Sequence, residues 1–230
     1  YLFYIGLLYF AYDHTAWIRK PDFMNVLTAA AIIVAGYMSA KMSLRRQNSL
    51  VYSIICAHER TKMDSLTGLY NHATFYERLS ARIQEHHQSF QPFSLIIMDI
   101  DDFKQVNDQN GHDAGDKIIM TLVGCIKANL REDEVAYRYG GEEFTIITNR
   151  VPDEDVVLAE SIRQSFEEAA RKTGNQTPAT VSIGIARFDA KRFGARREFF
   201  SAADEALYAA KRSGKNHTLV WHEDISVFHI

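Results

Sequence analysis

Acidic side chains gather at two points of the chain. The apolar stretch SLIIMDIDDFK ends in Asp99, Asp101 and Asp102, and RYGGEEFTII carries Glu142 and Glu143 directly after two glycines. Mg²⁺ usually takes one or two carboxylates from a protein together with substrate phosphates. A single acid at a strand end would most often only solvate that end. Three acids beside a second pair favour a divalent-metal site for phosphoryl chemistry.

The glycine pair Gly140-Gly141 predicts a two-residue turn between the apolar stretches EVAYRY and EFTII. In that register Arg138 faces Glu143 across the two strands, which makes them partners and leaves Glu142 free. Glycines also let a phosphate approach the backbone closely, because no Cβ intervenes. One acid from the strand end and one from this turn could together clamp a metal for phosphoryl chemistry, and the spacing alone does not assign them further.

Polar residues after the first acidic group could contact a nucleotide. The stretch NDQNGHDAGD is expected to form a loop before a helix, and its Asn107 and Asp116 carry groups that could read a purine edge. His112 either contacts the base or caps the loop, and ordinary loop chemistry is the alternative for all three. Lys211 and Lys215 either stabilise a helix C-terminus or contact phosphate.

Composition and missing motifs exclude several other classes. The net charge is −3 and no strong basic run is present, so we expect no nucleic-acid partner. The sequence has no Walker phosphate loop, no Rossmann glycine fingerprint, no paired metal-binding cysteines and no G-x-S-x-G. Cys56 and Cys125 lie far apart in unlike contexts, which fits a reducing compartment rather than a disulfide framework.

The elements that must position these groups alternate in type. Helical spacing is expected at 72–87, after Asp116, at 153–172 and at 198–212, and strands at 93–100, in the hairpin, at 180–188 and at 217–221. Alternation with one central hairpin predicts an α/β (α+β) fold, in which helices cover a central mixed β-sheet.

Two uncharged apolar stretches, residues 1–12 and 23–40, precede this region. The second is near the lower limit for crossing a bilayer, about 17–25 residues. Lys41, Arg45 and Arg46 follow it, which predicts that the next residues lie in the cytoplasm. Two buried helices of a soluble sensor are the alternative. Apolar residues at nearly seven-residue spacing then predict a helical connector.

Five motifs, in order, resemble the GGDEF family of diguanylate cyclases. They are DSLTGLYNH (64–72), MDIDDFKQVNDQNGHDAGD (98–116), RYGGEEF (138–144), VSIGIA (181–186) and ADEALYAAKRSGKN (203–216). The resemblance covers about 64–221. It implies the GGDEF-type mixed sheet, and an enzyme that joins two GTP molecules into cyclic di-GMP and releases two pyrophosphates. It also implies a homodimer, since two domains with one GTP each must face one another.

The resulting expectation has four segments. These are the end of a transmembrane sensor region (1–42), a helical signalling linker (43–63), the GGDEF domain (64–222) and a tail (223–230). A bacterial inner-membrane location follows, with the GGDEF domain facing the cytoplasm.

Motif by motif, the resemblance also implies the metal and catalytic residues. Asp99, the backbone carbonyl of Ile100 and Glu142 would bind Mg²⁺ or Mn²⁺. Glu142 would also help to deprotonate the attacking 3′-hydroxyl. Lys104 would stabilise charge on the transferring phosphate, so that positioning and electrostatics carry the catalysis.

Further residues would bind substrate or support the site. The guanine and ribose would be held by Asn107, His112 and Asp116, and the phosphates by Lys211, Lys215 and the space over Gly140 and Gly141. Asp101, Arg138 and Glu143 would have supporting roles.

Three positions depart from the family pattern. His72 stands where an Arg is usual, which puts an ion pair between linker and domain in doubt, and Lys215 stands where an Arg is usual. The inhibitory product site of many members is R-x-x-D, and here Arg131 is followed by Glu134. Glu keeps the charge but adds a methylene, which leaves product inhibition open.

Two other functions remain as alternatives. One is a catalytically silent GGDEF module that binds GTP or cyclic di-GMP as a signalling receptor, and the other is a generic Mg²⁺-dependent nucleotidyl transferase. Intact GGEEF, Asp99, Lys104 and Asn107 favour the active enzyme, because a pure receptor need not keep metal ligands and phosphate charges together.

Overall fold

The computed structural model describes residues 23–173 and 179–222, and the chain divides into two compact units between Arg60 and Thr61. The apolar stretch 1–12 and the predicted tail 223–230 lie outside the described residues. The first unit is described through helix α3 (Phe23–Thr61), and the second carries every strand of the described chain.

Helix α3 is one continuous helix of 39 residues, so the second apolar stretch and the predicted connector are not separated by a break. Its segment Val26–Asn48, 23 residues with a mean hydropathy of 1.5, is long and apolar enough to cross a bilayer. Tyr37 and Met38 are exposed, and none of the most apolar window is buried in the structure. Core helices and signal sequences pass the same test of length and composition, so membrane attachment stays a proposal.

The second unit contains a six-stranded mixed sheet of order β1-β3-β4-β2-β5-β6. The strands are β1 (Tyr70–Asn71), β2 (Ser94–Ile100), β3 (Val135–Arg138), β4 (Glu143–Thr148), β5 (Val181–Arg187) and β6 (Thr218–Val220). The edge pairs β1–β3 and β5–β6 are parallel, and the pairs that involve β2 or join β3 to β4 are antiparallel. The predicted mixed sheet is confirmed; the two-residue strand β1 was not foreseen.

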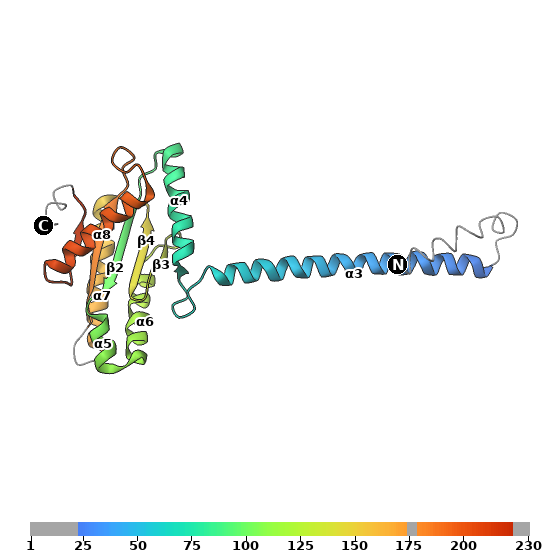
Figure 1. Ribbon diagram of the computed structural model, residues 1–230, viewed down its shortest axis with the longest axis horizontal. Coiled ribbons are helices and arrows are strands. Elements are labelled where there is room, and N and C mark those ends of the chain that lie inside the picture. Colours follow the sequence, from blue (N-terminus) through green and yellow to red (C-terminus); the bar gives the residue numbers. More distant parts are fainter. Residues whose placement is uncertain (1–22, 174–178, 223–230) are drawn as a thin grey trace. The chain divides into compact units, whose positions relative to one another are not determined.

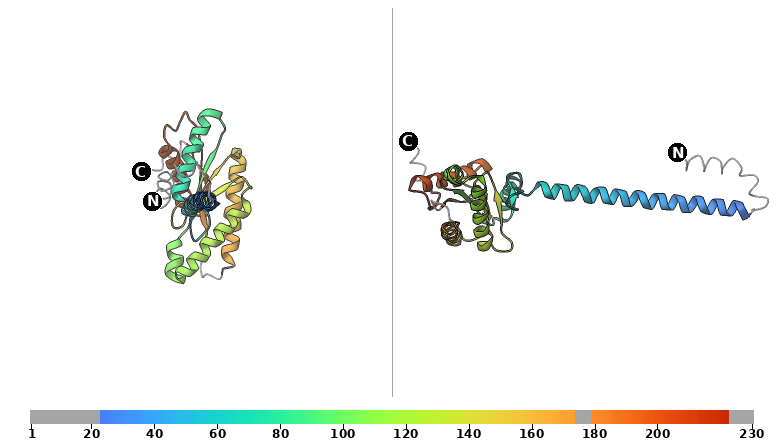
Figure 2. Two further views of the ribbon diagram at one scale, coloured as in Figure 1. Left: turned by 90° about the vertical axis from the view of Figure 1, so that its right-hand side faces the viewer. Right: turned by 90° about the horizontal axis from the view of Figure 1, so that it is seen from below.

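Helices cover both faces of this sheet (Figure 1). They are α4 (His72–Ser89), α5 (Phe103–Asn110), α6 (His112–Asn129), α7 (Pro152–Arg171) and α8 (Arg196–Arg212). One hydrophobic core packs α5, α6 and α7 against the sheet, and a second packs α4 and α8 against the opposite face. Figure 2 shows helices on both sides of the strands.

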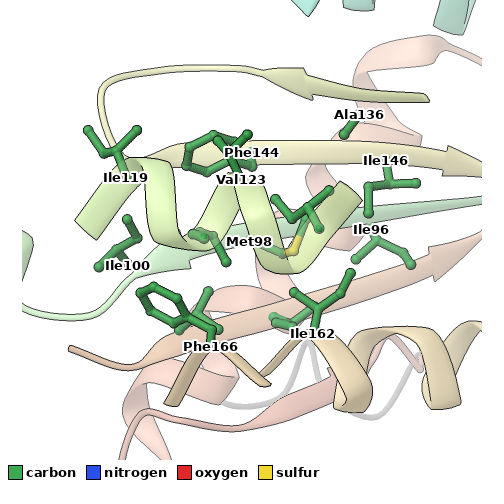
Figure 3. Close-up of a cluster of buried hydrophobic side chains, with 14 of the residues drawn as sticks. Ile96, Met98, Ile100, Ile119, Val123, Ala136, Phe144, Ile146, Ile162 and Phe166 are labelled. Atoms are coloured by element: carbon green, nitrogen blue, oxygen red, sulfur yellow. The ribbon is translucent and has the colours of Figure 1, made fainter. Parts of the chain in front are cut away.

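Strand β2 lies in the middle of the sheet and is buried throughout, as its unbroken apolar run predicts. Ile96, Met98 and Ile100 face the core of α6 and α7, where they meet side chains of β4 and of both helices (Figure 3). Leu95 and Ile97 face the core of α4 and α8. Side chains alternate along a strand, so Asp99 is on the α8 side of the sheet.

Residues 107–116, predicted as a loop, are helical on both sides of a single break at Gly111. Helix α5 was missed, and α6 begins at His112, before the predicted start at Asp116. Gly111 has a φ of 83°, which glycine adopts without strain. The many Asn, Asp and Gly residues indicated a loop, but Phe103 and Val106 bury one face of α5 and tertiary packing decides the structure.

Helix α8 packs unusually close to β5. A Cβ atom added at Gly184 would lie 2.3 Å from both the Ala203 carbonyl oxygen and the Leu207 amide nitrogen. Helix α8 faces β5 with alanines, including Ala202 and Ala206, so the two backbones can approach. The position of Lys211 in the last turn of α8 is therefore fixed relative to the sheet.

Candidate active site

The loop after β3 differs from the prediction by one residue. Arg138 is opposite Phe144, not Glu143, and the Glu143 carbonyl accepts hydrogen bonds from the amides of both Tyr139 and Gly140. The predicted two-residue turn is therefore wrong: Gly140, Gly141 and Glu142 all belong to the connecting loop. Glu142 is presented by this loop, whereas Glu143 begins β4.

Arg138 has a different partner from the one predicted. Its Nη1 atom lies 2.9 Å from Asp64 Oδ1, and its guanidinium donates to the carbonyls of Gly140 and Gly141. The predicted Arg138–Glu143 pair is thus contradicted. Asp64 belongs to the turn at the start of the second unit, where its Oδ1 also accepts from the Thr67 hydroxyl. Arg138 consequently ties this first turn to the glycine loop.

His72 does not take part in that ion pair. Its ring packs 4.7 Å, centroid to centroid, from the rings of Tyr76 and Tyr139. The two tyrosine hydroxyls are 2.8 Å apart and hydrogen bonded. An aromatic cluster therefore supports the residue that precedes Gly140. The Arg138–Asp64 ion pair lies within the second unit, so the predicted loss of an ion pair between linker and domain stays a prediction.

The three residues predicted to bind metal lie at one corner of the sheet. Asp99 is the penultimate residue of β2 and is 8% exposed. The amide of Ile100 donates to the carbonyl of Glu142 at 3.3 Å, which brings the glycine loop against the end of β2. Two carboxylates and a carbonyl are the hard oxygen donors that Mg²⁺ and Mn²⁺ accept.

These donors fit a metal whose coordination is completed by other oxygens. Within 23–173 and 179–222, no three His, Cys, Asp or Glu side chains are grouped closely enough to hold a metal ion. Mg²⁺ commonly binds through one or two carboxylates and completes its shell with water and nucleotide phosphate. The predicted set of Asp99, Glu142 and the Ile100 carbonyl matches that pattern.

Acids outnumber bases around this corner. Burial raises the pKa of Asp99 to about 6, and the charges of Glu142 and Glu143 add to the rise while Lys211 opposes it. Burial also raises the pKa of Glu143, and Asp204 on α8 adds to that rise. Repelling carboxylates of this kind favour a cation at the site.

Two of the lysines predicted to contact phosphate, Lys211 and Lys215, pair with acids. Lys211 Nζ lies 2.7 Å from Asp99 Oδ1, and Lys215 Nζ lies 2.6 Å from Asp102 Oδ1. Lys104 is exposed in the first turn of α5. All three are thus near the end of β2, and two of them pair with neighbouring acids.

The Asp101 carboxylate is not directed to the same site as that of Asp99. Strand β2 ends at Ile100, and the Asp101 carboxylate turns to the hydroxyls of Thr180 and Ser182, at 2.8 and 2.7 Å. It also accepts from the backbone amide of Asn216 at 3.0 Å. Asp101 is 4% exposed and satisfied by these bonds, so its contacts tie together three segments beside the site.

The predicted base-binding residues surround the break between α5 and α6. Asn107 lies in α5, and His112 and Asp116 lie in the first turns of α6. The Oδ1 atom of Asn107 is buried and has no hydrogen-bond partner among the described residues. It fills a space that only glycine leaves at position 115, since a Cβ there would be 2.0 Å away. A guanine amino group is the type of donor that this oxygen lacks.

The predicted product site has internal partners. Glu134 Oε1 lies 2.6 Å from Arg150 Nε, and its Oε2 lies 2.5 Å from Arg150 Nη2. The Arg131 amide also donates to Glu134, while the Arg131 guanidinium pairs with Glu154 at 3.0 Å. Burial pushes the pKa of Glu134 up, but the bonds from Arg150 and Arg131 outweigh it and lower the pKa.

Several residues of this arrangement were not foreseen. Asp64, Arg150 and Asp204 were given no role, because their partners are distant in sequence and depend on the hairpin register. Asp64 carried a usable signal, since it lies in the first of the five motifs. Nothing in the sequence pattern singled out Arg150.

Comparisons with known proteins identify the family of this chain. The family described as "Diguanylate cyclase, GGDEF domain" matches residues 61–217. Diguanylate cyclase DgcM of Escherichia coli is 36% identical over 157 residues, which are 68% of this chain and 37% of that protein. Probable diguanylate cyclase DgcT of E. coli is 33% identical over 229 residues, 95% of this chain and 46% of that protein. The chain therefore spans less than half the length of these relatives.

A solved structure of similar fold comes from Caulobacter crescentus. It contains the coiled coil and GGDEF domain of DgcB in complex with c-di-GMP, and superposes with a TM-score of 0.71 at 26% identity. The superposition covers 82% of this chain and 98% of that one. The family match and the identity to its members show that the chain belongs to the GGDEF family of diguanylate cyclases.

Proposed function

We propose that this chain is a diguanylate cyclase that condenses two GTP molecules into cyclic di-GMP and two pyrophosphates. The observation that carries the proposal is the convergence of Asp99, the Ile100 backbone and Glu142 at the corner of the sheet, with Lys211 in contact. Diguanylate cyclases among the relatives support the same activity.

The metal would be Mg²⁺ or Mn²⁺, held by Asp99, Glu142 and the Ile100 carbonyl. When bound, such an ion neutralises phosphate charge and orients the reacting groups. Glu142 is on the loop rather than in a strand and is partly exposed, so its carboxylate can accept the proton of an incoming 3′-hydroxyl. Lys104 stabilises charge on the transferring phosphate, and Lys211 and Lys215 bind the outer phosphates.

The base is held at the other side of the site. Asn107 offers the guanine edge its buried, unpartnered oxygen. His112 and Asp116, beside the Gly111 break, hold the remaining base and ribose groups. Gly140 and Gly141 leave the space that the triphosphate needs above the loop.

A single site of this kind binds one GTP, and each product molecule is made from two. Two chains must therefore face each other, and we propose a homodimer. Helix α3 supports the proposal, because a 39-residue helix can pair with a second copy and align two catalytic units. The candidate span Val26–Asn48 supports attachment to the bacterial inner membrane, and the basic residues Lys41, Arg45 and Arg46 near its end support a GGDEF domain in the cytoplasm.

The test is a cyclisation assay on the whole 230-residue chain in detergent micelles, with GTP and Mg²⁺ or Mn²⁺. Chromatography should show cyclic di-GMP and pyrophosphate in a ratio of one to two. Failure to form product, even when the chain is dimeric by light scattering, would leave the silent receptor as the better function. A parallel assay with added cyclic di-GMP tests whether product inhibits through Arg131 and Glu134.

A further inference from the structure

Lys211, which we propose to bind phosphate, contacts an acidic side chain of the same site. Its ammonium lies 2.7 Å from Asp99, the acid that is proposed to bind the metal. The Lys211 side chain is 33% exposed and that of Asp99 12%, so solvent only partly screens the contact. A cation supplied by the protein therefore contacts one of the proposed metal ligands.

The charges nearby explain why a cation is held there. The negative charges of Glu142 and Glu143 repel the Asp99 carboxylate, and the charge of Asp204 repels the Glu143 carboxylate. Lys211 acts on this acidic group from the last turn of α8, and its charge offsets part of the mutual repulsion. Without it, carboxylates would face one another close to a partly buried corner, which costs free energy.

We propose that Lys211 is a displaceable counter-ion of the metal site, which occupies Asp99 until a metal–nucleotide complex arrives. The inference rests on the proposed function and adds an order of binding to it. A divalent cation alone must compete with the tethered ammonium for Asp99. GTP brings a triphosphate that attracts Lys211, so the two cations exchange partners: Asp99 then binds the metal, and Lys211 binds phosphate.

Lys215 provides a matched control within the same motif. It is also proposed to bind phosphate and also pairs with an acid, since its Nζ lies 2.6 Å from Asp102. That acid is 54% exposed and is not among the proposed metal ligands. Removal of the Lys215 charge should weaken nucleotide binding without freeing a metal ligand.

The experiment measures Mn²⁺ binding to the whole chain in detergent micelles by electron paramagnetic resonance, without nucleotide. Lys211→Met should bind Mn²⁺ alone about tenfold more tightly than wild type, because Asp99 loses its competing charge. Lys211→Arg keeps a cation and should stay close to wild type. Lys215→Met should also match wild type. Circular dichroism of each variant checks that the fold is retained.

A second measurement uses a GTP analogue with a methylene bridge between the α- and β-phosphorus atoms, at saturating Mn²⁺. Lys211→Met and Lys215→Met should both bind it more weakly than wild type, because both lose a phosphate contact. Tighter metal binding with weaker nucleotide binding, in Lys211→Met alone, is the signature of a shared counter-ion.

Equal Mn²⁺ affinity in wild type and a folded Lys211→Met variant overturns the inference, as does equal tightening in Lys215→Met. Neither result affects the proposed function, which depends on product formation by the wild-type chain. Conversely, a chain that forms no cyclic di-GMP but shows the Lys211-specific tightening loses the proposed activity and keeps the counter-ion.

Discussion

The two ends of the β3–β4 hairpin differ in how completely their acidic side chains are paired. At the glycine-loop end, Asp99 and Glu142 lie among further acids, and the Lys211 ammonium gives Asp99 a single point contact. At the far end, Glu134 is bound by two nitrogens of Arg150 and a backbone amide, with 7% of its side chain exposed. A saturated pair stabilises the fold, whereas an unsaturated group can exchange its partner for a ligand.

The sharpest test of the loop end is Glu142→Gln. Loss of the carboxylate removes a metal ligand and the proton acceptor together, so cyclic di-GMP formation should fall about a thousandfold, equivalent to about 4 kcal/mol. Thermal stability should hold or rise, because one repelling charge has been removed. Product is measured by chromatography, with Glu132→Gln, an exposed acid at the far end, as control. A Glu142→Gln enzyme as active as wild type would contradict the assigned role.

Glu134→Gln tests the far end. The substitution leaves Arg150 without its charged partner in a nearly buried position, which should lower the free energy of unfolding by about 3 kcal/mol. Cyclase activity per folded molecule at low temperature should stay near wild type. Denaturant unfolding at neutral pH measures the loss, and Glu168→Gln, an exposed acid paired with Lys172, is the control.

The stability difference between wild type and Glu134→Gln should depend on pH. Glu134 has a folded-state pKa below its ordinary value of 4.5, so its contribution is complete above that pH and is lost as pH falls through the folded-state pKa. The stability gap between wild type and Glu134→Gln should therefore be constant from pH 7 to about 5 and narrow in more acidic solution. A gap that widens below pH 4 would show that the pair is not ionic.

Arg138→Lys addresses what holds the glycine loop. A lysine can meet Asp64 or a loop carbonyl but cannot bridge both, so Glu142 should be less well positioned. We expect kcat to fall about tenfold with little change in KM for GTP. Arg171→Lys, in an exposed helical pair with Glu167, serves as control. A change confined to KM would place the role of Arg138 in binding rather than in positioning.

The smallest expected effect belongs to the aromatic cluster. Tyr76→Phe removes one hydrogen bond, to the Tyr139 hydroxyl, and should lower stability by about 1 kcal/mol. If the pair acts as a unit, Tyr139→Phe in the Tyr76→Phe background should cost little more. Thermal melts of the two single variants and the double variant decide this. Strictly additive losses would mean that the hydroxyls have other partners.

Much of the fold could be predicted from local pattern. Strand β2 was visible as an unbroken apolar run, and α4, α7 and α8 as helical spacing within two residues of their observed ends. Helix α5 was not visible, because its eight residues bury only Phe103 and Val106 and consist otherwise of polar residues. For such a short element, tertiary packing outweighs composition.

The sequence was sufficient to identify the residues of the candidate site, but not to predict which of them contact one another. Motif order pointed to Asp99 and Glu142, but the partner of Arg138 depended on a loop one residue longer than the glycine pair indicated. A shift of one residue changes every facing pair in a hairpin. The bonds of Asp101 to Thr180 and Asn216 could not be predicted for a related reason, since they join segments 79 and 115 residues apart.

Those distant bonds also bear on how the protein folds. Asp101 can be satisfied only after β5 has docked beside β2 and the segment after α8 has returned to the same corner. Contacts at such separations carry a large loop-closure cost and form late in folding. Nucleotide affinity should therefore be the last native property to appear during refolding, after the central strands have acquired protection from hydrogen exchange.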